Sequence, residues 1–291
     1  MQRLPIIGQT LTHSPFEAVQ RAAIEAASIP IQLEGWERRA HQLPAAIAAL
    51  READVAGALV AQPHKEKAAG LVDALSDDAR HTGAVNVIVH DGDRLRGHNT
   101  DVNGLRTGLA ALLPGVQARW PRHAVILGAG GGARAAVSLL ISSGLQRVAV
   151  FNRHLHRAEA LVAHFARHAR HMDLRALPWH EAILEAELSR GGLLVNSSGI
   201  GLEEGVSPIP AELLPPDLFV LDLVLQHAST PLMAAAAERG GTVATGQASF
   251  LASSAVTFKL LTGSKAPAAV MRSALASELG LPEEGVAVVG D

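Results

Sequence analysis

The chain has 291 residues, of which 48% are hydrophobic and 18% charged, enough for two globular domains with their own cores. Its net charge of −3, with both signs interspersed, argues against binding to nucleic acid or anionic membrane. Cysteine is absent, which excludes disulfides, thiolate metal ligands and a cysteine nucleophile. There is no secretory signal or long apolar run, so we expect a cytoplasmic protein.

Short apolar runs alternate with alanine-rich helical stretches, which predicts an α/β fold with largely parallel sheets. The expected strands cover 4–7, 31–33, 57–60, 125–127, 147–151, 193–195 and 218–223, and the clearest helices cover 16–27, 43–51 and 133–142. Residues 84–99 (AVNVIVHDGDRLRGHN) predict a β-hairpin turning at Asp91-Gly92, with Asn86 opposite Gly97 or His98. This hairpin brings Asn86 close to Asp101.

A domain boundary is expected near residues 101–104, where a second strand–loop–helix unit follows. We expect an α/β domain in residues 1–103 and a nucleotide-binding domain in residues 104–247. From the residues alone, the terminal helices (248–291) fit either domain.

The strongest local motif is a glycine-rich loop between a strand and a helix in residues 123–140 (HAVILGAGGGARAAVSLL). It satisfies G-x-G-x-x-A in full context, and such loops let the backbone approach a pyrophosphate at the helix N-terminus. The alternative is a glycine-rich turn without a ligand. We expect a dinucleotide on Gly128, Ala129, Gly130, Gly131, Gly132 and Ala133.

The next strand ends in Asn152 and Arg153, with Arg157 one helical turn later and no acid to grip a ribose 2′-hydroxyl. Two guanidinium groups without a carboxylate suit a 2′-phosphate, so NADP is predicted rather than NAD. A solvated basic helix start is the alternative.

Three polar residues lie at the starts of predicted helices in or at the end of the first domain. Ser14 fits an N-cap, with Pro15 next and Glu17 completing a capping box, and its hydroxyl and that of Thr12 can also hold a carboxylate. Lys65 lies in a first helical turn, where a cation opposes the helix dipole. An exposed lysine tolerates this position, whereas a lysine facing a cleft would have its pKa lowered toward acid–base work. Asp101, in RGHNTDVNG, is either a helix-start acid or a substrate contact.

His164, His168 and His171 recur at helical spacing in HFARHARH and resemble metal ligands. Because arginines separate them and no acid lies in the run, we predict a solvated helix face and no metal site.

Taken in order, these motifs resemble the shikimate dehydrogenases over nearly the whole chain. The family's Ser-x-Ser-Pro corresponds to Thr12–Pro15 and its P-x-K to Pro63–Lys65. The matches continue through GAVN (83–86), GHNTD (97–101), GAGGGARAA (128–136), NRH (152–154), NSSGIG (196–201) and STPL (229–232).

The resemblance implies an N-terminal substrate-binding domain, joined by the terminal helices, and a Rossmann-type NADP domain. It implies Lys65 and Asp101 as catalytic residues, and a substrate site of Thr12, Ser14, Asn86, Asp101 and Ser253. Ser197 and Gly246 join the cofactor contacts. The implied reaction is reversible NADP-dependent interconversion of shikimate and 3-dehydroshikimate, within aromatic amino acid biosynthesis.

Four positions differ from the family pattern. Ala61, Leu225 and Ser253 stand where the family usually has threonine, tyrosine and glutamine, and the asparagine that usually follows Ser-Pro is absent. Each lost hydrogen bond to a buried polar substrate costs about 1–3 kcal/mol. These differences predict weaker recognition of the shikimate ring.

Two classes of function therefore fit the sequence. One is an NADP-dependent dehydrogenase, a monomer or homodimer, acting on shikimate, quinate or another carboxylated cyclic polyol. The other is a non-catalytic NADP-binding sensor, although a sensor has no need for both Lys65 and Asp101.

Overall fold

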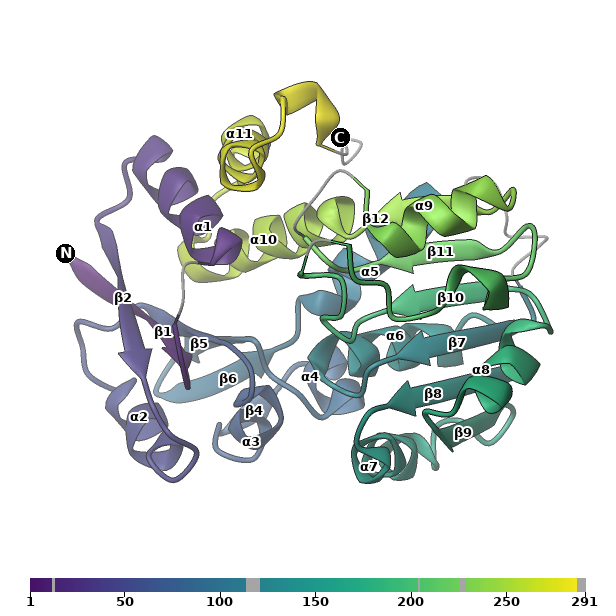
Figure 1. Ribbon diagram of the computed structural model, residues 1–291. Helices are drawn as coiled ribbons and strands as arrows, with labels where there is room; N and C mark the ends of the chain where they lie inside the picture. The colour runs from purple at the N-terminus through teal and green to yellow at the C-terminus, as the bar shows by residue number, and fades with distance from the viewer. Residues whose placement is uncertain (12–13, 114–120, 204, 226–228, 287–291) are drawn as a thin grey trace. The chain divides into compact units, whose positions relative to one another are not determined.

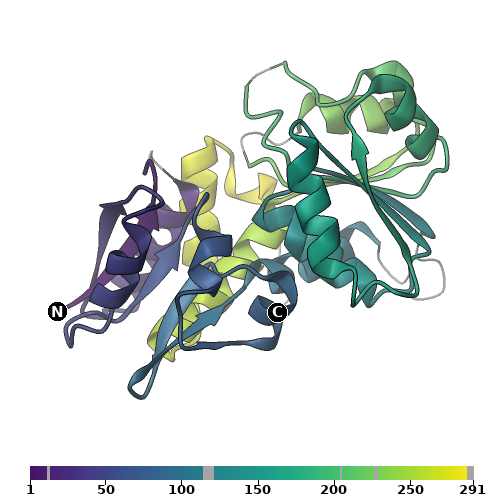
Figure 2. The ribbon, with the colours of Figure 1, turned by 90° about the horizontal axis from the view of Figure 1, so that it is seen from below.

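The computed structural model describes residues 1–11, 14–113, 121–203, 205–225 and 229–286. These residues form two compact units. The first contains Met1–Gly104 and Phe250–Val286, and the second contains Leu105–Ser249. In Figures 1 and 2 the first unit runs from purple to blue and ends in yellow, whereas the second is teal to green.

The first unit is built on a mixed six-stranded sheet with the order β2-β1-β3-β5-β6-β4. Strand β1 is parallel to β2 and β3, and β4 is parallel to β6, while β5 is antiparallel to β3 and β6. The strand bounds are β1 Gln2–Gly8, β2 Ile31–Glu37, β3 Gly57–Val60, β4 Ala74–Leu75, β5 Val87–Asp91 and β6 Arg94–His98.

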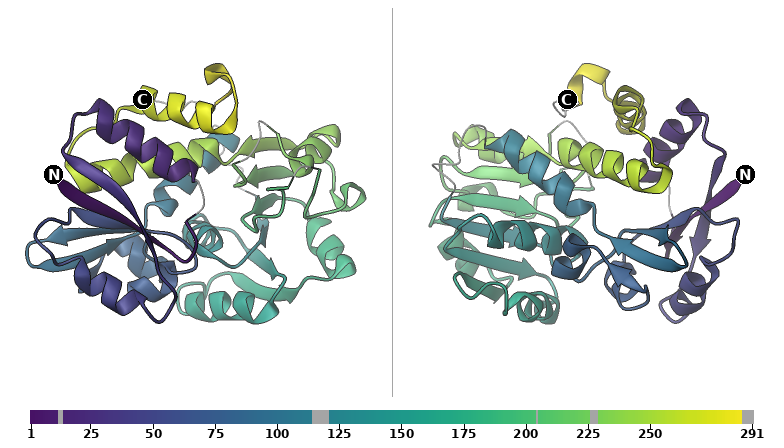
Figure 3. Two further views of the ribbon diagram at one scale, coloured as in Figure 1. Left: turned by 60° about the vertical axis from the view of Figure 1, so that its left-hand side comes forward. Right: turned by 180° about the vertical axis from the view of Figure 1, so that it is seen from behind.

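Helices cover both faces of this sheet. In the left view of Figure 3, α1, α10 and α11 lie on one side and α2 on the other. Side chains of α2, including Leu43 and Ile47, pack with Ile7, Val60 and Ile88 of the sheet in one buried cluster. The bounds are α1 Pro15–Ala26, α2 Leu43–Ala49, α3 Lys65–Ala69, α4 Asp77–Thr82, α10 Gln247–Thr262 and α11 Ala268–Leu279, followed by a short 3-10 helix, Glu283–Gly285.

The second unit is built on an all-parallel sheet with the order β12-β11-β10-β7-β8-β9. The strand bounds are β7 His123–Leu127, β8 Arg147–Asn152, β9 Asp173–Pro178, β10 Leu193–Asn196, β11 Phe219–Asp222 and β12 Thr242–Thr245. The helices are α5 Asp101–Leu112, whose first four residues belong to the first unit, α6 Gly131–Ile141, α7 Leu155–Phe165, α8 Glu181–Leu188, α9 Pro231–Glu238 and the 3-10 helix Ala211–Leu213. The chain runs outward from β7 through β8 to β9 and then returns to β10 beside β7. In such sheets, ligands bind beyond the carboxyl ends of the strands at this reversal. The predicted α/β class is therefore confirmed.

The predicted hairpin is present, but its turn is one residue later than expected. Asp91 pairs with Arg94, so the loop consists of Gly92 and Asp93, with Gly92 in the left-handed region at a φ of 62°. Val87 is consequently the residue opposite His98. The predicted pairing of Asn86 with Gly97 or His98 is wrong because the strands remain paired through Asp91.

The predicted histidine face on a helix is also wrong in its geometry. Helix α7 ends at Phe165, and the chain then turns so that β9 can begin at Asp173 and pair with β8. His168 and His171 therefore lie beyond the helix, and the His171 ring lies 2.9 Å from the Ile141 carbonyl oxygen. Within the described ranges, no group of three or more histidine, cysteine or acidic residues is arranged to hold a metal ion.

No helix in the described part of the chain has the length and apolar character needed to cross a bilayer.

Candidate active site and dinucleotide site

The polar centre of the first unit is an ion pair between Lys65 and Asp101. Lys65 Nζ lies 2.7 Å from Asp101 Oδ2, and the two side chains are 18% and 21% exposed. Lys65 is the first residue of α3 and Asp101 the first residue of α5. A partly buried pair that still reaches solvent can exchange a proton with a bound molecule.

Asn86 fixes the second carboxylate oxygen of Asp101. Its Nδ2 donates to Asp101 Oδ1 and to Thr100 Oγ1, each at 2.9 Å, and its Oδ1 accepts from the Thr100 N–H at 2.9 Å. Asn86 is 5% exposed, so its amide is committed to these contacts. The predicted closeness of Asn86 and Asp101 is thus confirmed, and Asp101 has one oxygen on an amide and the other on an ammonium.

A buried group of hydroxyls extends this network to α10. Thr100 Oγ1 lies 2.8 Å from Ser253 Oγ and 2.9 Å from Thr257 Oγ1. Ser253 is 6% exposed, and Thr100 and Thr257 are fully buried. Ser253, expected at the substrate site, is therefore connected to Asp101 through Thr100 and Asn86. Thr257 was not predicted, although its place four residues after Ser253 puts both on one helix face.

The hydrogen bonds at the start of α5 show whether Asp101 is needed to cap that helix. The Asp101 N–H donates to Asn99 Oδ1 at 3.0 Å, and the Asn99 amide donates to Thr82 Oγ1 and the Ala84 carbonyl oxygen, each at 3.0 Å. The capping group is therefore Asn99, which leaves the Asp101 carboxylate for Lys65 and Asn86. The acid occupies the first helical position, where the dipole favours its charge, and also belongs to the polar centre.

The residue before Lys65 anchors the start of α3. His64 is 1% exposed, and its Nε2 lies 2.6 Å from the backbone carbonyl oxygen of Arg38. A carbonyl oxygen only accepts, so Nε2 carries the proton. The segment enters the helix through a cis Gln62-Pro63 peptide bond, and the Lys65 carbonyl oxygen accepts from the Val85 N–H at 2.8 Å. Sequence analysis missed His64, whose only signal was its place inside P-x-K.

Ser14 is the N-cap of α1, as expected, with Pro15 as the first helical residue. Its Oγ accepts from the Phe16 N–H at 3.3 Å. The full capping box is wrong, because the Glu17 carboxylate pairs with Arg21 instead of returning to the cap. The hydroxyl proton of Ser14 has no acceptor among the described residues. Thr12 lies outside the described residues.

In the second unit, the glycine-rich loop lies at the reversal between β7 and β10. Gly128 has a φ of 110°, and a Cβ there would lie 2.7 Å from the Ser197 carbonyl oxygen. Gly130 is the N-cap of α6 without a side-chain cap bond, and the helix begins at Gly131. The first N–H groups of α6 therefore have no side-chain acceptor from their cap, which is the arrangement that binds phosphate.

Ser197 and Gly246 lie near this loop. Ser197 donates from its N–H and its hydroxyl to the Leu127 carbonyl oxygen, at 2.8 and 2.9 Å, so the loop after β10 is bound to the end of β7. A Cβ on Gly246 would lie 2.8 Å from Leu223 Cα, and one on Gly132 would lie 3.4 Å from the Leu223 side chain. The structure thus groups Gly128, Gly132 and Ser197, with Gly246 beside Leu223.

The basic residues after β8 face solvent. Asn152 ends β8 and donates from Nδ2 to the His154 carbonyl oxygen at 2.9 Å, while Arg153 and Arg157 are exposed. Neither arginine forms an ion pair with a described residue. Their guanidinium groups are therefore available to an anion at the end of β8.

A buried carboxyl that sequence analysis did not single out connects the loops after β10 and β11. Asp222 is fully buried and accepts from Asn196 Nδ2 at 2.9 Å, Thr230 Oγ1 at 2.7 Å and the Val224 N–H at 3.1 Å. Burial raises its pKa, and these hydrogen bonds act in the opposite direction. The signal in the sequence was a polar residue at the end of each of two neighbouring buried strands.

Comparisons with known proteins agree with this arrangement. Residues 6–88 match a family described as "Shikimate dehydrogenase substrate binding domain", and residues 117–188 match "Shikimate / quinate 5-dehydrogenase". The shikimate dehydrogenase (NADP(+)) of Geobacter metallireducens is 34% identical over 92% of this chain and 94% of that protein. The chain belongs to the shikimate dehydrogenase family.

Two proteins of Thermus thermophilus strains extend this finding. One, a shikimate dehydrogenase (NADP(+)), is 35% identical over 97% of this chain and all of its own length. The other is a shikimate 5-dehydrogenase crystallised with NADP(H) and shikimate. It has 31% identity and a TM-score of 0.76 over 95% of this chain and 99% of that one.

Within a shikimate dehydrogenase, three of the unusual positions now have a structural description. The Ser253 hydroxyl is buried and hydrogen-bonded with Thr100 Oγ1 at 2.8 Å. Ala61 is partly exposed after β3, and its N–H donates to the Ile7 carbonyl oxygen at 2.9 Å. Leu225 is partly exposed, three residues after the end of β11. None of these side chains offers the hydroxyl, phenol or amide that the family pattern led us to expect.

Proposed function

We propose that this protein catalyses the reversible NADP-dependent interconversion of shikimate and 3-dehydroshikimate, with related carboxylated cyclic polyols as further candidate substrates. The observation that carries this proposal is the 2.7 Å contact between Lys65 and Asp101, with Asn86 on the other carboxylate oxygen. A non-catalytic sensor would not need an acid–base pair held in this way. Full-length similarity to shikimate dehydrogenases supports the same conclusion.

The second unit fits a dinucleotide phosphate. Gly128 has no room for a side chain beside Ser197, and α6 begins without a side-chain cap, so the backbone forms a cradle for a pyrophosphate. Arg153 and Arg157 are exposed and have no acidic partner among the described residues, which suits a ribose 2′-phosphate. When bound there, NADP would supply the hydride donor or acceptor.

In the direction of reduction, the carbonyl carbon of 3-dehydroshikimate gains a hydride and its oxygen becomes an alkoxide in need of a proton. Lys65 Nζ donates that proton, and Asp101 holds the ammonium in position through its 2.7 Å contact. In the direction of oxidation, the pair takes the proton from the ring hydroxyl as the hydride leaves the same carbon. Asn86 keeps the carboxylate of Asp101 oriented throughout.

The substrate carboxylate requires donors outside this pair. Ser14 has a hydroxyl proton available at the start of α1, where the dipole favours an anion, and Thr12 precedes it in sequence. The Asn86–Thr100–Ser253 network would support the ring side of the site. We therefore propose Thr12, Ser14 and Asp101 as substrate contacts, with Asn86 and Ser253 as substrate-site residues that act through their contacts to Asp101 and Thr100.

The proposal is tested by following the absorbance of the reduced nicotinamide (NADPH or NADH) with the purified protein and a panel of shikimate, quinate and related hydroxy acids, each with NADP⁺ and NAD⁺. Turnover of shikimate with NADP⁺ supports it. Faster turnover of quinate would shift the assignment to a quinate-type enzyme, and NADP⁺ binding without turnover of any panel member would favour a sensor. A cytoplasmic location and a monomeric or homodimeric state belong to the same proposal, and gel filtration with light scattering tests the latter.

A further inference from the structure

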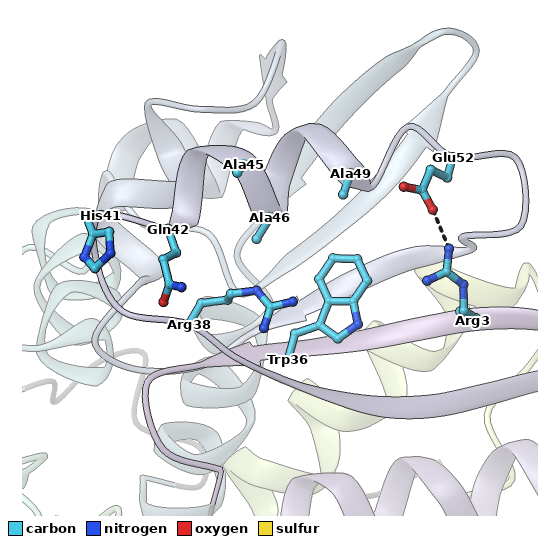
Figure 4. A pocket seen from close by; sticks show the side chains of 9 residues that line it. All are labelled: Arg3, Trp36, Arg38, His41, Gln42, Ala45, Ala46, Ala49 and Glu52. Carbon is cyan, nitrogen blue, oxygen red and sulfur yellow. Dashed lines mark hydrogen bonds and ion pairs between the residues drawn. The ribbon is translucent and has the colours of Figure 1, made fainter.

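A groove in the first unit lies between β2 and α2, and nothing in the proposed reaction uses it. Its volume is about 640 Å³, within the range of small-molecule sites. Trp36 and Arg38 line it from β2 and the following loop, and Ala45, Ala46 and Ala49 line it from α2. Figure 4 shows the Trp36 indole and the Arg38 guanidinium lying beneath this helix. We refer to it as the β2–α2 groove.

The middle of the groove has an apolar lining. Trp36 is only partly buried, and its one polar atom is satisfied, because Nε1 donates to Glu34 Oε1 at 2.8 Å. The indole and the side chains of Ala45, Ala46 and Ala49 give the groove its apolar lining, and the Arg38 guanidinium lies over part of the indole ring. A planar ring is the shape that buries most apolar area against such a lining.

One end of the groove offers hydrogen-bond donors. Arg38 lies with its guanidinium 5.5 Å from the Trp36 ring centre, and one of its N–H groups donates to the Glu37 carbonyl oxygen at 2.9 Å. Within the described part of the chain, no carboxylate pairs with it. Gln42 Oε1 already accepts from the Arg39 N–H, which leaves the Gln42 amide as a donor, and the exposed His41 ring lies at the same end.

The opposite end of the groove, at Arg3, is rich in carboxylates instead of hydrogen-bond donors. Arg3 lines it together with Glu52, and Arg3 donates to Glu52 at 2.6 Å and to Asp54 at 2.8 Å, with Glu34 at 3.5 Å. Three carboxylates around one guanidinium leave an excess of negative charge there. An anion in the groove would therefore be directed toward Arg38 and away from Arg3.

We propose that the β2–α2 groove binds an aromatic carboxylate, with its ring against the apolar lining formed by Trp36 and the alanines of α2 and its carboxylate on Arg38 and Gln42. This site belongs to the first unit alone and is separate from the Lys65–Asp101 pair. Its occupancy does not depend on which polyol the enzyme oxidises.

The test uses the full chain labelled with 5-fluorotryptophan and 2-naphthoate as the probe. The protein has three tryptophans, and Trp36→Phe identifies the ¹⁹F resonance of Trp36. We expect 2-naphthoate to shift this resonance with saturation. The resonance of Trp179, a residue of the second unit that Trp179→Phe identifies in the same way, should stay in place. Because detection is local, binding of the probe at the substrate site would not be mistaken for binding here.

Two comparisons test whether Arg38 binds the carboxylate of the probe or whether the probe only adsorbs to the apolar lining of the groove. Arg38→Gln should weaken binding at least tenfold, whereas Arg39→Gln, an exposed neighbour that does not line the groove, should leave it unchanged. The neutral analogue 2-naphthamide should bind at least tenfold more weakly than 2-naphthoate. A Trp36 resonance that does not move, equal affinity for the acid and the amide, or wild-type affinity in Arg38→Gln would each overturn the proposal.

Discussion

The Nε2 atom of His64 lies 2.6 Å from the backbone carbonyl oxygen of Arg38, which ties the loop after β2 to the residue that precedes Lys65. Lys67 reinforces the same connection, because its Nζ donates to the Ala40 carbonyl oxygen at 2.6 Å. The position of the proposed catalytic lysine is thus fixed from outside its own five-residue helix, which is too short to be rigid alone.

His64→Phe should lower the free energy of unfolding by about 1 kcal/mol or more, because an aromatic ring is kept while the donor to the Arg38 carbonyl oxygen is lost. It should also lower kcat more than it weakens NADP⁺ binding, since Lys65 follows directly. Urea unfolding and steady-state kinetics measure both effects. His64→Gln retains an N–H donor and should recover part of the loss; a wild-type kcat in His64→Phe would show that the contact does not position Lys65.

Lys65→Met should reduce kcat by about 10²–10⁴-fold, the usual contribution of a positioned proton-transfer group. NADPH affinity should stay the same, because the proposed cofactor residues lie in the second unit. The control is Lys265→Met, which removes an exposed lysine that lies outside both proposed sites. Turnover near the wild-type rate in Lys65→Met would exclude Lys65 as the proton donor.

NADP⁺ should bind at least tenfold more tightly than NAD⁺, a difference of about 1.4 kcal/mol. Arg153→Ala should weaken NADP⁺ and leave NAD⁺ nearly unchanged, because the exposed guanidinium would contact only the 2′-phosphate. Calorimetric titration with both cofactors checks this. Arg167→Ala, an exposed arginine beyond the end of α7, serves as the control. Equal affinity of the wild-type protein for the two cofactors would contradict the prediction.

Asp222 predicts a specific pH dependence of stability. Burial raises its pKa in the folded state above the unfolded value of 3.8, so the folded protein holds this proton more tightly. The resulting contribution to stability is complete below pH 3.8 and is lost as the pH rises through the folded-state pKa. Asp222→Asn cannot ionise, so the stability difference between wild type and variant should move in favour of the variant across that interval.

Unfolding free energies of wild type and Asp222→Asn from pH 4 to pH 7 measure this effect. The asparagine retains an acceptor for Asn196 but faces Thr230 with an amide, so a constant offset between the two proteins is expected as well. The exposed Asp217→Asn is the control. A difference in stability that does not vary with pH would show that the pKa of Asp222 is not raised.

Sequence patterns identified the elements that are buried on both sides. Strands β7, β8 and β10 are runs of valine, isoleucine, leucine and alanine, and they were predicted to within two residues at each end. The missed strands β9 and β12 are the two edges of the same sheet and are largely half-exposed. Edge strands do not need a continuous apolar run, and β9 contains Asp, Arg and Pro, so periodicity gave no signal there.

In the candidate site, contacts set by local sequence were predicted, and contacts set by long-range packing were missed. The hairpin was sufficient to bring Asn86 to Asp101, because strand pairing follows from short-range turn chemistry. The contact between Thr100 and Ser253 joins residues 153 positions apart, and no local pattern specifies which face of α10 meets the start of α5. The Asn196–Asp222 contact was missed for the same reason, since it depends on the order of strands in the sheet.

The last prediction concerns recognition of the shikimate ring. Ala61, Leu225 and Ser253 offer no group of the kind that the family pattern would place there, and the buried Ser253 hydroxyl is hydrogen-bonded with Thr100. A site that lacks such hydrogen bonds binds a polyhydroxylated ring weakly, at about 1–3 kcal/mol per missing bond. Shikimate should therefore be oxidised with a KM in the millimolar range or above, at the upper end of the usual span.

The triple variant Ala61→Thr, Leu225→Tyr, Ser253→Gln should lower that KM, with Asn86 and Asp101 untouched and the Lys65-dependent step preserved. Ser253→Gln alone separates two effects, because it adds an amide but also removes the partner of Thr100. If the unmodified protein oxidises shikimate with a micromolar KM, other residues supply the missing contacts and this account of the substrate site is wrong.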